Sequence, residues 1–176
     1  MSLPENYFKL FSLPEQYSLD QKALDTAYRT ILAHTHPDFA TAGEAQKRVA
    51  VQWTARANDA YRILKDPLQR AIHLLHLRGI ELGTETNAAM GQAFLMQQME
   101  WRERLEAAAT SKNQPALRAL LDQLHEAARR HFNTLTRLFE SETHQEAAEI
   151  TRQLMFIQRV KDEARSRLDA LNDTMT

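Results

Sequence analysis

The sequence predicts an all-α fold: an N-terminal helical hairpin followed by a C-terminal three-helix bundle. Two observations carry this prediction. The 176 residues include only 4 Gly and 5 Pro, and these are the residues that disfavour helices most strongly. Apolar residues also recur with the helical period of 3.6 along almost the whole chain. The length suits one domain or two small ones.

The first half of the chain begins with a short helical segment over residues 6–11. A second helix follows Ser18-Leu19-Asp20-Gln21, which we interpret as a capping box. This helix is expected to run to about His34, because Pro37 disfavours helix in the residue before it. Residues 36–43 are interpreted as a loop.

Two more helices complete this half. The first is expected over residues 44–65 and ends at Asp66-Pro67. Pro67 then suits the first turn of a helix over residues 68–78, which Gly79 ends in the left-handed conformation.

The second half is predicted to be a bundle. Residues 79–87 are rich in glycine and polar turn residues, so we divide the chain into domain 1–78, linker 79–87 and domain 88–176. Three long helices are expected over residues 88–109, 115–139 and 143–171, the last beginning at a capping box from Thr143 to Glu146. Because the links between them are short, neighbouring helices should be antiparallel.

Two helices of the bundle carry more apolar residues than one core face can hold. At about 100° per residue, Leu95 and Met99 lie away from Phe94 on the first helix, and Met96 lies on its far side. On the last helix, Phe156 lies outside the core stripe. Clustered exposed apolar residues mark interaction sites, so we predict a solvent-accessible patch that a partner covers. A wide core stripe with isolated exposed residues is the alternative. Charged residues of the same helix would border the patch as a polar rim: Glu100, Arg102 and Glu103.

Composition excludes several function classes. Lys and Arg number 22 against 23 Asp and Glu, whereas general nucleic-acid binding usually needs a basic surplus. The absence of Cys removes disulfides, thiolate metal sites and cysteine nucleophiles. No apolar run approaches the ~18 residues of a membrane span, and the N-terminus lacks the pattern of a signal peptide. We expect a cytoplasmic protein without nucleic-acid or membrane partners.

The sequence carries no catalytic or metal-binding motif that we can identify. The pairs His34/His36 and His73/His76 each supply only two ligands, which do not close a structural zinc site; we interpret His73 and His76 as packing or surface residues. Neither a glycine-rich phosphate loop nor a nucleophile elbow is present. We therefore expect neither an enzyme nor a bound cofactor.

One tripeptide, His36-Pro37-Asp38, suits a rigid docking point. Pro37 fixes its own φ, so an imidazole and a carboxylate are presented with little motion, which lowers the entropic cost of binding. Taken alone, three such residues are better explained by an ordinary turn that contains Asp, and only the surrounding sequence favours the docking point.

Three further motifs accompany the tripeptide: Tyr7-Phe8-Lys9-Leu10-Phe11, Asn58-Asp59-Ala60-Tyr61 and Asp66-Pro67-Leu68-Gln69-Arg70-Ala71. Together with it, they make up a pattern over residues 5–75 that closely resembles a J-domain. Further segments, among them residues 94–103 and 152–157, extend the resemblance. Over nearly its whole length, the chain resembles the HscB-type co-chaperones of iron–sulfur cluster assembly.

The resemblance implies two binding sites. J-domains bind a DnaK-class chaperone and stimulate its ATPase; the matching residues are His36, Pro37 and Asp38, with Lys22 and Arg29 supplying a positive face. The bundle of this family binds the scaffold protein on which clusters are assembled. The residues implied for that second site are Leu95, Met96, Met99, Glu100, Arg102, Glu103 and Phe156.

The sequence also departs from the general J-domain pattern. Phe39 replaces the Lys that often follows the tripeptide, and the basic face of the second helix is sparse. Both features favour a dedicated HscA-class partner, and the lack of an N-terminal cysteine module favours a bacterial member. A J-protein with a different client, whose bundle serves packing or dimerisation, is the alternative.

Overall fold

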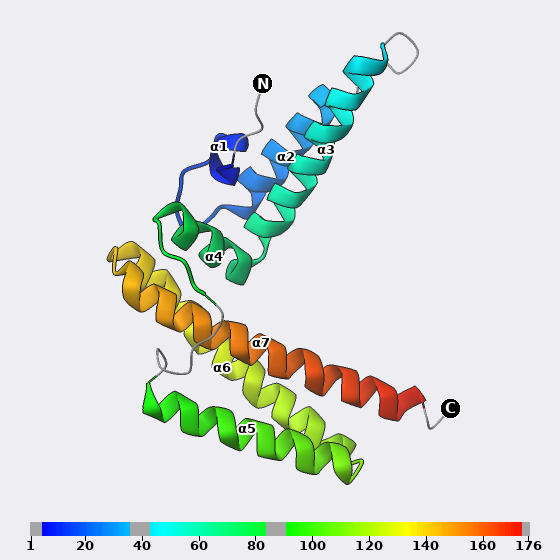
Figure 1. The fold of residues 1–176 in the computed structure, drawn as a ribbon, viewed down its shortest axis with the longest axis vertical. Helices are drawn as coiled ribbons and strands as arrows, with labels where there is room; N and C mark the ends of the chain where they lie inside the picture. The colour runs from blue at the N-terminus through cyan, green and yellow to red at the C-terminus, as the bar shows by residue number, and fades with distance from the viewer. Residues whose placement is uncertain (1–4, 36–42, 84–90, 174–176) are drawn as a thin grey trace. The chain divides into compact units, whose positions relative to one another are not determined.

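The computed structural model describes residues 5–35, 43–83 and 91–173. All regular secondary structure within these ranges is helical, which confirms the predicted all-α class (Figure 1). The helices are α1 (Tyr7–Leu10), α2 (Gln21–Thr35), α3 (Glu44–Lys65), α4 (Pro67–Leu77), α5 (Gln92–Thr110), α6 (Gln114–Glu140) and α7 (His144–Asp173).

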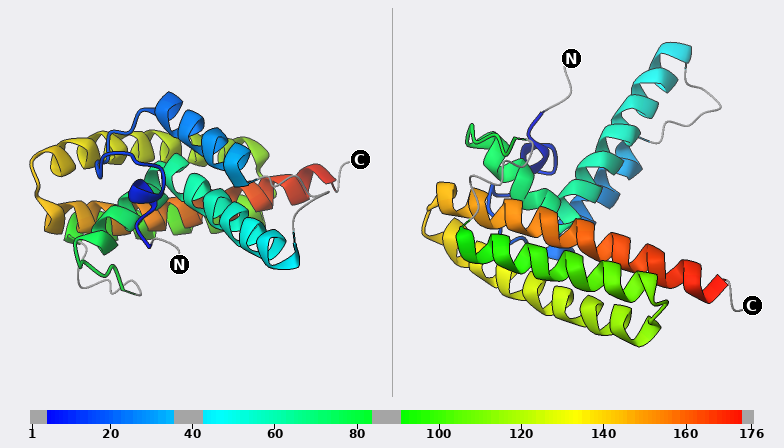
Figure 2. Two further views of the ribbon diagram at one scale, coloured as in Figure 1. Left: turned by 90° about the horizontal axis from the view of Figure 1, so that it is seen from above. Right: turned by 60° about the horizontal axis from the view of Figure 1, so that its bottom comes forward.

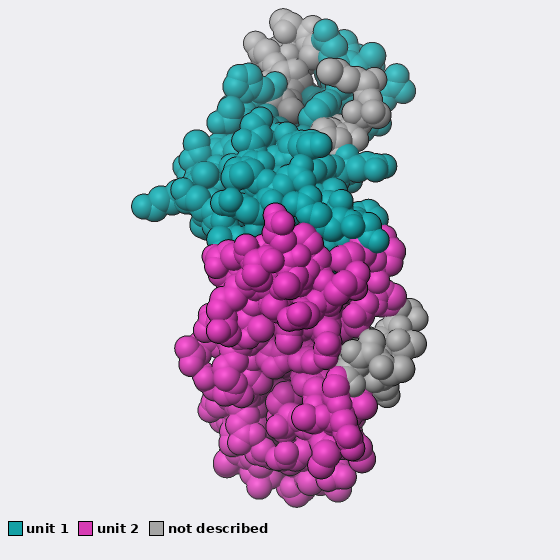
Figure 3. Space-filling model, turned by 90° about the vertical axis from the view of Figure 1, so that its left-hand side faces the viewer, with its two compact units in different colours: residues 1–79 teal, residues 80–176 magenta. Residues whose placement is uncertain are grey.

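The chain divides into two compact units, residues 1–79 and residues 80–176 (Figure 3). The division lies at the start of the expected linker. Within the second unit, the guanidinium Nε of Arg152 donates to the Leu82 carbonyl at 3.0 Å, so the described end of the linker is tied to α7.

The first unit is built on an antiparallel hairpin of α2 and α3 (Figure 1). Ala57 and Ala60 of α3 are fully buried. The rings of Tyr28 and Tyr61 stack across the pair with centroids 4.2 Å apart, and Tyr28 Oη donates to Asn58 Oδ1 at 2.8 Å. Helices α1 and α4 both pack on α3, and the core they share includes Phe8, Leu24, Leu64 and Leu75.

Local side chains set the helix ends of this unit. Asp20 begins α2, because its Oδ1 accepts from the Lys22 backbone N–H at 2.9 Å; the expected cap at Ser18 was wrong by two residues. Asp66 caps α4 by accepting from the Leu68 and Gln69 N–H groups at 2.8 and 3.0 Å. Pro67 stands in the first turn, and Gly79 follows the helix with φ of +74°, as predicted.

The second unit is a bundle of α5, α6 and α7 (Figure 2). Helices α6 and α7 form the most extensive contact, and α5 packs against both. The core is mostly aliphatic, with two aromatic side chains, Trp101 and Phe156. Its large aliphatic members include Leu105, Leu117, Leu120, Leu124, Leu135, Leu154 and Ile157. No helix in the described ranges combines the length and apolar character needed to cross a membrane.

Candidate functional site

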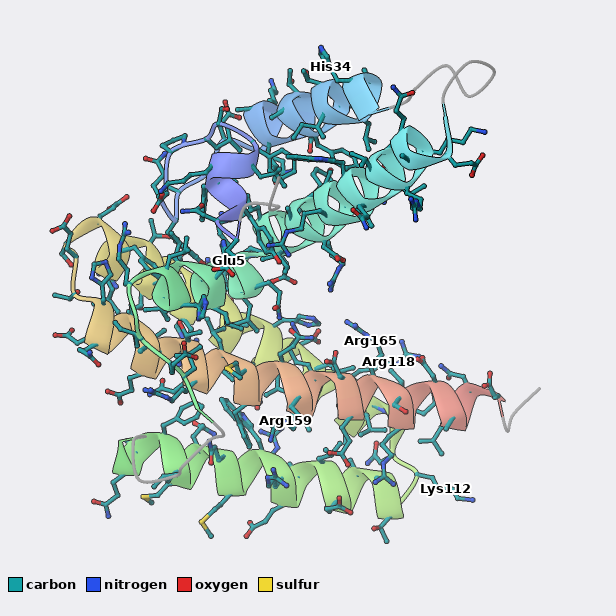
Figure 4. The ribbon with its side chains drawn as sticks, turned by 45° about the horizontal axis from the view of Figure 1, so that its top comes forward. Glu5, His34, Lys112, Arg118, Arg159 and Arg165 are labelled. Carbon is teal, nitrogen blue, oxygen red and sulfur yellow. The ribbon has the colours of Figure 1, made fainter. Side chains whose placement is uncertain are left out.

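The tripeptide His36, Pro37 and Asp38 lies outside the residues that the structure describes. The helices on either side of it are described: α2 ends at Thr35 and α3 begins at Glu44. His34, labelled in Figure 4, stands at the end of α2 with its Nδ1 2.7 Å from the Thr30 carbonyl oxygen. The tripeptide therefore belongs to the connection between two antiparallel helices.

The predicted positive face lies on α2. Lys22 and Arg29 are both exposed, and a spacing of seven residues places them on one side of the helix, about 10 Å apart along its axis. Asp25 lies between them in sequence, but its carboxylate accepts from Tyr61 Oη at 2.8 Å and Gln21 Nε2 at 2.9 Å. These two hydrogen bonds lower the pKa of Asp25, so its negative charge is committed to the contact with α3.

The exposed side of α5 carries most of the second predicted site. Met96 and Met99 are 66% and 63% exposed. Leu95 is half-buried. The three charged residues predicted around them are all exposed: Glu100, Arg102 and Glu103. The accessibility predicted for Met99 is confirmed.

The accessibility predicted for Phe156 was wrong, because the structure leaves its side chain only 3% exposed. Its ring is nearly perpendicular to that of Phe94, with the centroids 6.0 Å apart, and the Arg102 guanidinium lies 5.3 Å from its centroid. Since α7 packs against both α5 and α6, its buried arc is wider than a single apolar stripe. Phe156 therefore supports α5 from beneath and does not form part of the open surface.

A polar chain links α6 to α7 below the same helix. The Nδ1 and Nε2 atoms of His131 lie 2.8 Å from the Ala127 carbonyl oxygen and from Gln153 Oε1. Gln153 Nε2 in turn donates to Glu149 Oε1 at 3.4 Å, and the His131 ring lies 6.0 Å from that of Phe94. This chain fixes the floor on which Phe94 and α5 rest.

Sequence reasoning missed a groove between α5 and α6. It has a volume of about 450 Å³ and polar walls. Its lining includes Glu100, Trp101, Arg104, Asp122, Glu126 and Arg130. The available signal was the run of polar residues three or four apart on α6.

The described residues contain no group of three His, Cys, Asp or Glu side chains able to hold a metal ion. The geometry suits the binding of other proteins. The bundle carries an apolar surface with a charged rim, and the other unit carries a helical hairpin with exposed basic residues on α2.

Comparison with known proteins decides the family. The model of the HSCB C-terminal oligomerisation domain matches residues 90–165. A co-chaperone protein HscB homolog of Paraburkholderia xenovorans is 54% identical over 173 residues, covering 98% of this chain and 99% of its own length. The chain belongs to the HscB co-chaperone family. A homolog of Burkholderia thailandensis is also 54% identical, over 97% of this chain and 98% of its own length.

Solved structures agree with this assignment. Chaperone HscB from Vibrio cholerae is 40% identical, with a TM-score of 0.77 over 94% of this chain and 99% of that one. Human co-chaperone protein HscB is 25% identical, with a TM-score of 0.85 over 94% of this chain and 83% of the human one. The predicted resemblance is confirmed, and the chain is a J-protein co-chaperone of the type that serves iron–sulfur cluster assembly. The relatives' names indicate no catalytic activity.

Proposed function

We propose that this protein stimulates the ATPase of a dedicated HscA-class chaperone and delivers the iron–sulfur scaffold protein to it. The observation that supports the proposal most directly is the pair of exposed methionines on α5, Met96 and Met99. They lie in a different compact unit from the helical hairpin that carries the tripeptide. One chain can then hold a chaperone and its client at the same time. The two relatives that are 54% identical are bacterial, and we propose the bacterial cytoplasm as the site of action.

At the chaperone end, His36, Pro37 and Asp38 engage the ATPase, with Lys22 and Arg29 as its positive face. Asp38 suits an arginine of the partner through charge-assisted hydrogen bonds. The protein performs no chemistry of its own in this proposal. It favours the hydrolysis-competent state of the chaperone by binding that state more tightly than the others.

At the scaffold end, Leu95, Met96 and Met99 form the apolar centre. Methionine adapts to irregular partner surfaces because its side chain is unbranched and polarizable. Burying each such side chain contributes roughly 1.5–3 kcal/mol before the costs of association, which suits a transient complex. Glu100, Arg102 and Glu103 supply the rim, and the buried Phe156 holds α5 in place.

The scaffold site is tested by calorimetric titration of the scaffold protein into the parent and into the Met96→Glu, Met99→Glu double variant. Both methionines are exposed, so the variant is expected to fold normally and to lose binding by more than about tenfold, since two charges are forced into an apolar contact. Val51→Glu is the matched control, because Val51 is 62% exposed on α3 in the other unit. Equal affinity of the parent and the double variant would reject the site.

The chaperone site is tested by His36→Gln. This change is expected to abolish ATPase stimulation while leaving the circular dichroism spectrum and scaffold binding intact. Undiminished stimulation at matched concentration would reject the assignment.

A second candidate function is self-association through the bundle. It is favoured by the description of the matched family model, which names a C-terminal oligomerisation domain. Sedimentation of the parent and of the methionine double variant separates the two: a concentration-dependent dimer that the double variant loses would support self-association on α5.

A further inference from the structure

One carboxylate in the lining of the groove between α5 and α6, that of Asp122, has no cationic partner among the described residues. Arg104 lies 3.8 Å from Glu100 and donates a hydrogen bond to Gln123. Glu126 is held by two arginines, because Arg129 donates to its carboxylate at 2.9 and 2.7 Å and Arg130 lies 3.6 Å from it. Asp122, by contrast, makes no ion pair or hydrogen bond through its carboxylate with any residue that the structure describes.

The floor of the groove is an indole. Trp101 is 5% exposed and is held by an edge-on contact with Phe94 at a centroid distance of 6.0 Å. Its N–H donates no hydrogen bond to the described part of the chain. Tryptophan is enriched among the residues that dominate binding energies at protein interfaces, and an unpaired indole N–H suits a carbonyl oxygen of a partner.

The groove is continuous with the exposed side of α5. Glu100 lines the groove and also belongs to the rim of the methionine surface. It follows Met96 by one helical turn and Met99 by one residue, so these side chains lie on adjoining faces of the same helix. A protein seated on the methionines therefore reaches the groove without a separate binding event.

From this arrangement we infer that the groove receives one lysine or arginine side chain of the scaffold protein, whose docking surface then extends from α5 onto α6. The cation pairs with Asp122, and its hydrocarbon stem packs beside Trp101, as long basic side chains do on apolar surface. A carbonyl near that residue accepts from the indole. The inference rests on the proposed function, because the scaffold supplies the basic side chain.

A cation fits this groove better than an anion does. An entering anion would lie next to the like charge of Asp122 and would compete with Glu100 and Glu126 for the arginines in the walls. An entering cation breaks no existing pair. Its volume of about 450 Å³ leaves room for a single long side chain together with water.

The test is titration of the scaffold into the full chain carrying Asp122→Asn or Asp122→Lys, at low and high salt. Asp122→Asn is expected to weaken binding by about twofold to fivefold and to reduce its salt dependence. Asp122→Lys is expected to weaken it by about tenfold or more, because like charges then face each other. Asp169→Lys makes the same charge change at an exposed position of α7 and should bind as the parent does.

The outcomes separate this inference from the proposed function. If the parent binds, the methionine double variant does not, and Asp122→Lys binds like Asp169→Lys, the groove assignment is overturned while the scaffold function stands. If the parent binds no scaffold, both fail together. A charge-reversal experiment identifies the partner residue: each exposed Lys and Arg of the scaffold is changed in turn to Glu, and binding to the Asp122→Lys variant is measured. One of these changes should restore affinity, and if none does, the pairing is also overturned.

Discussion

At the scale of single residues, His73 shows how a polar side chain becomes part of the core. Its Nε2 accepts the Tyr7 backbone N–H at 3.2 Å, and its ring stacks on that of Tyr7 with centroids 4.4 Å apart. Burial, helped by the nearby charges of His76 and Arg56, lowers the pKa of His73 from 6.5 to about 4. The neutral ring is therefore the form that joins α1 to α4.

This shift predicts a loss of stability in mild acid. Between pH 6.5 and about 4, the unfolded chain binds a proton at this position and the folded chain does not, so stability falls as the pH falls through that window. After allowance for partial solvent exposure, the loss is about 1–2 kcal/mol. Urea unfolding at pH 7 and 4.5 measures it. His73→Gln keeps a hydrogen-bond acceptor that does not titrate, so its stability should depend less on pH. The control is His125→Gln, at an exposed position of α6 in the other unit, and its pH profile should follow that of the parent. Identical pH profiles of the parent and His73→Gln would contradict this assignment.

Arg70 illustrates a motif residue whose role here is structural. The side chain is 8% exposed, and its guanidinium donates to the carbonyl oxygens of Leu64 and Tyr17 at 2.7 Å each and of Lys65 at 3.4 Å. Lysine lacks the planar arrangement of N–H groups that lets arginine donate to these three carbonyl oxygens at once. We predict that Arg70→Lys lowers the free energy of unfolding by about 2–3 kcal/mol, since buried carbonyls lose their donors. Arg78→Lys, on an exposed side chain, should change it by less than about 0.5 kcal/mol, and equal effects in urea unfolding would refute the role.

At the scale of helices, the sequence predicted what local signals determine. The bounds of α3 came out as expected, because Asp66-Pro67 ends one helix and begins the next without help from distant residues. The start of α2 was misplaced because Ser18 and Asp20 both suit a cap, and only the hydrogen bond to Lys22 decides between them. The burial of Phe156 depends on α5 lying against α7, which no periodicity within α7 can report.

The corrected position of Phe156 predicts two different consequences on one face. Phe156→Ala should lower the free energy of unfolding by about 3–5 kcal/mol, because it leaves a cavity under Phe94 and Arg102. Met99→Ala, on a side chain that is 63% exposed, should change it by less than about 0.5 kcal/mol. Thermal or urea unfolding of the two single variants distinguishes them. A comparably small effect of both would place Phe156 at the surface after all.

At the scale of the whole molecule, the two units carry separate sites on one chain. Residues 1–79 hold the hairpin and residues 80–176 hold the bundle. The groove was not predicted from the sequence, because Asp122 lies on α6 and Trp101 on α5, and they line one groove only when these helices pack together. If the protein is an adaptor, its advantage is the effective concentration gained by linking two binding modules covalently, and that advantage requires both sites in the same molecule.

This linkage predicts that two defective variants cannot complement each other. We expect the scaffold to increase ATPase stimulation by the parent at limiting concentrations of all three proteins. Neither His36→Gln nor the Met96→Glu, Met99→Glu variant should show this increase, and an equimolar mixture of the two should not restore it, because each chain holds only one partner. A mixture of the parent with an equal amount of His36→Gln is the control for competition, and it should keep a reduced increase. Full restoration by the two defective variants would show that the sites act from separate chains, in solution or within an oligomer, and would reject the adaptor mechanism in its single-chain form.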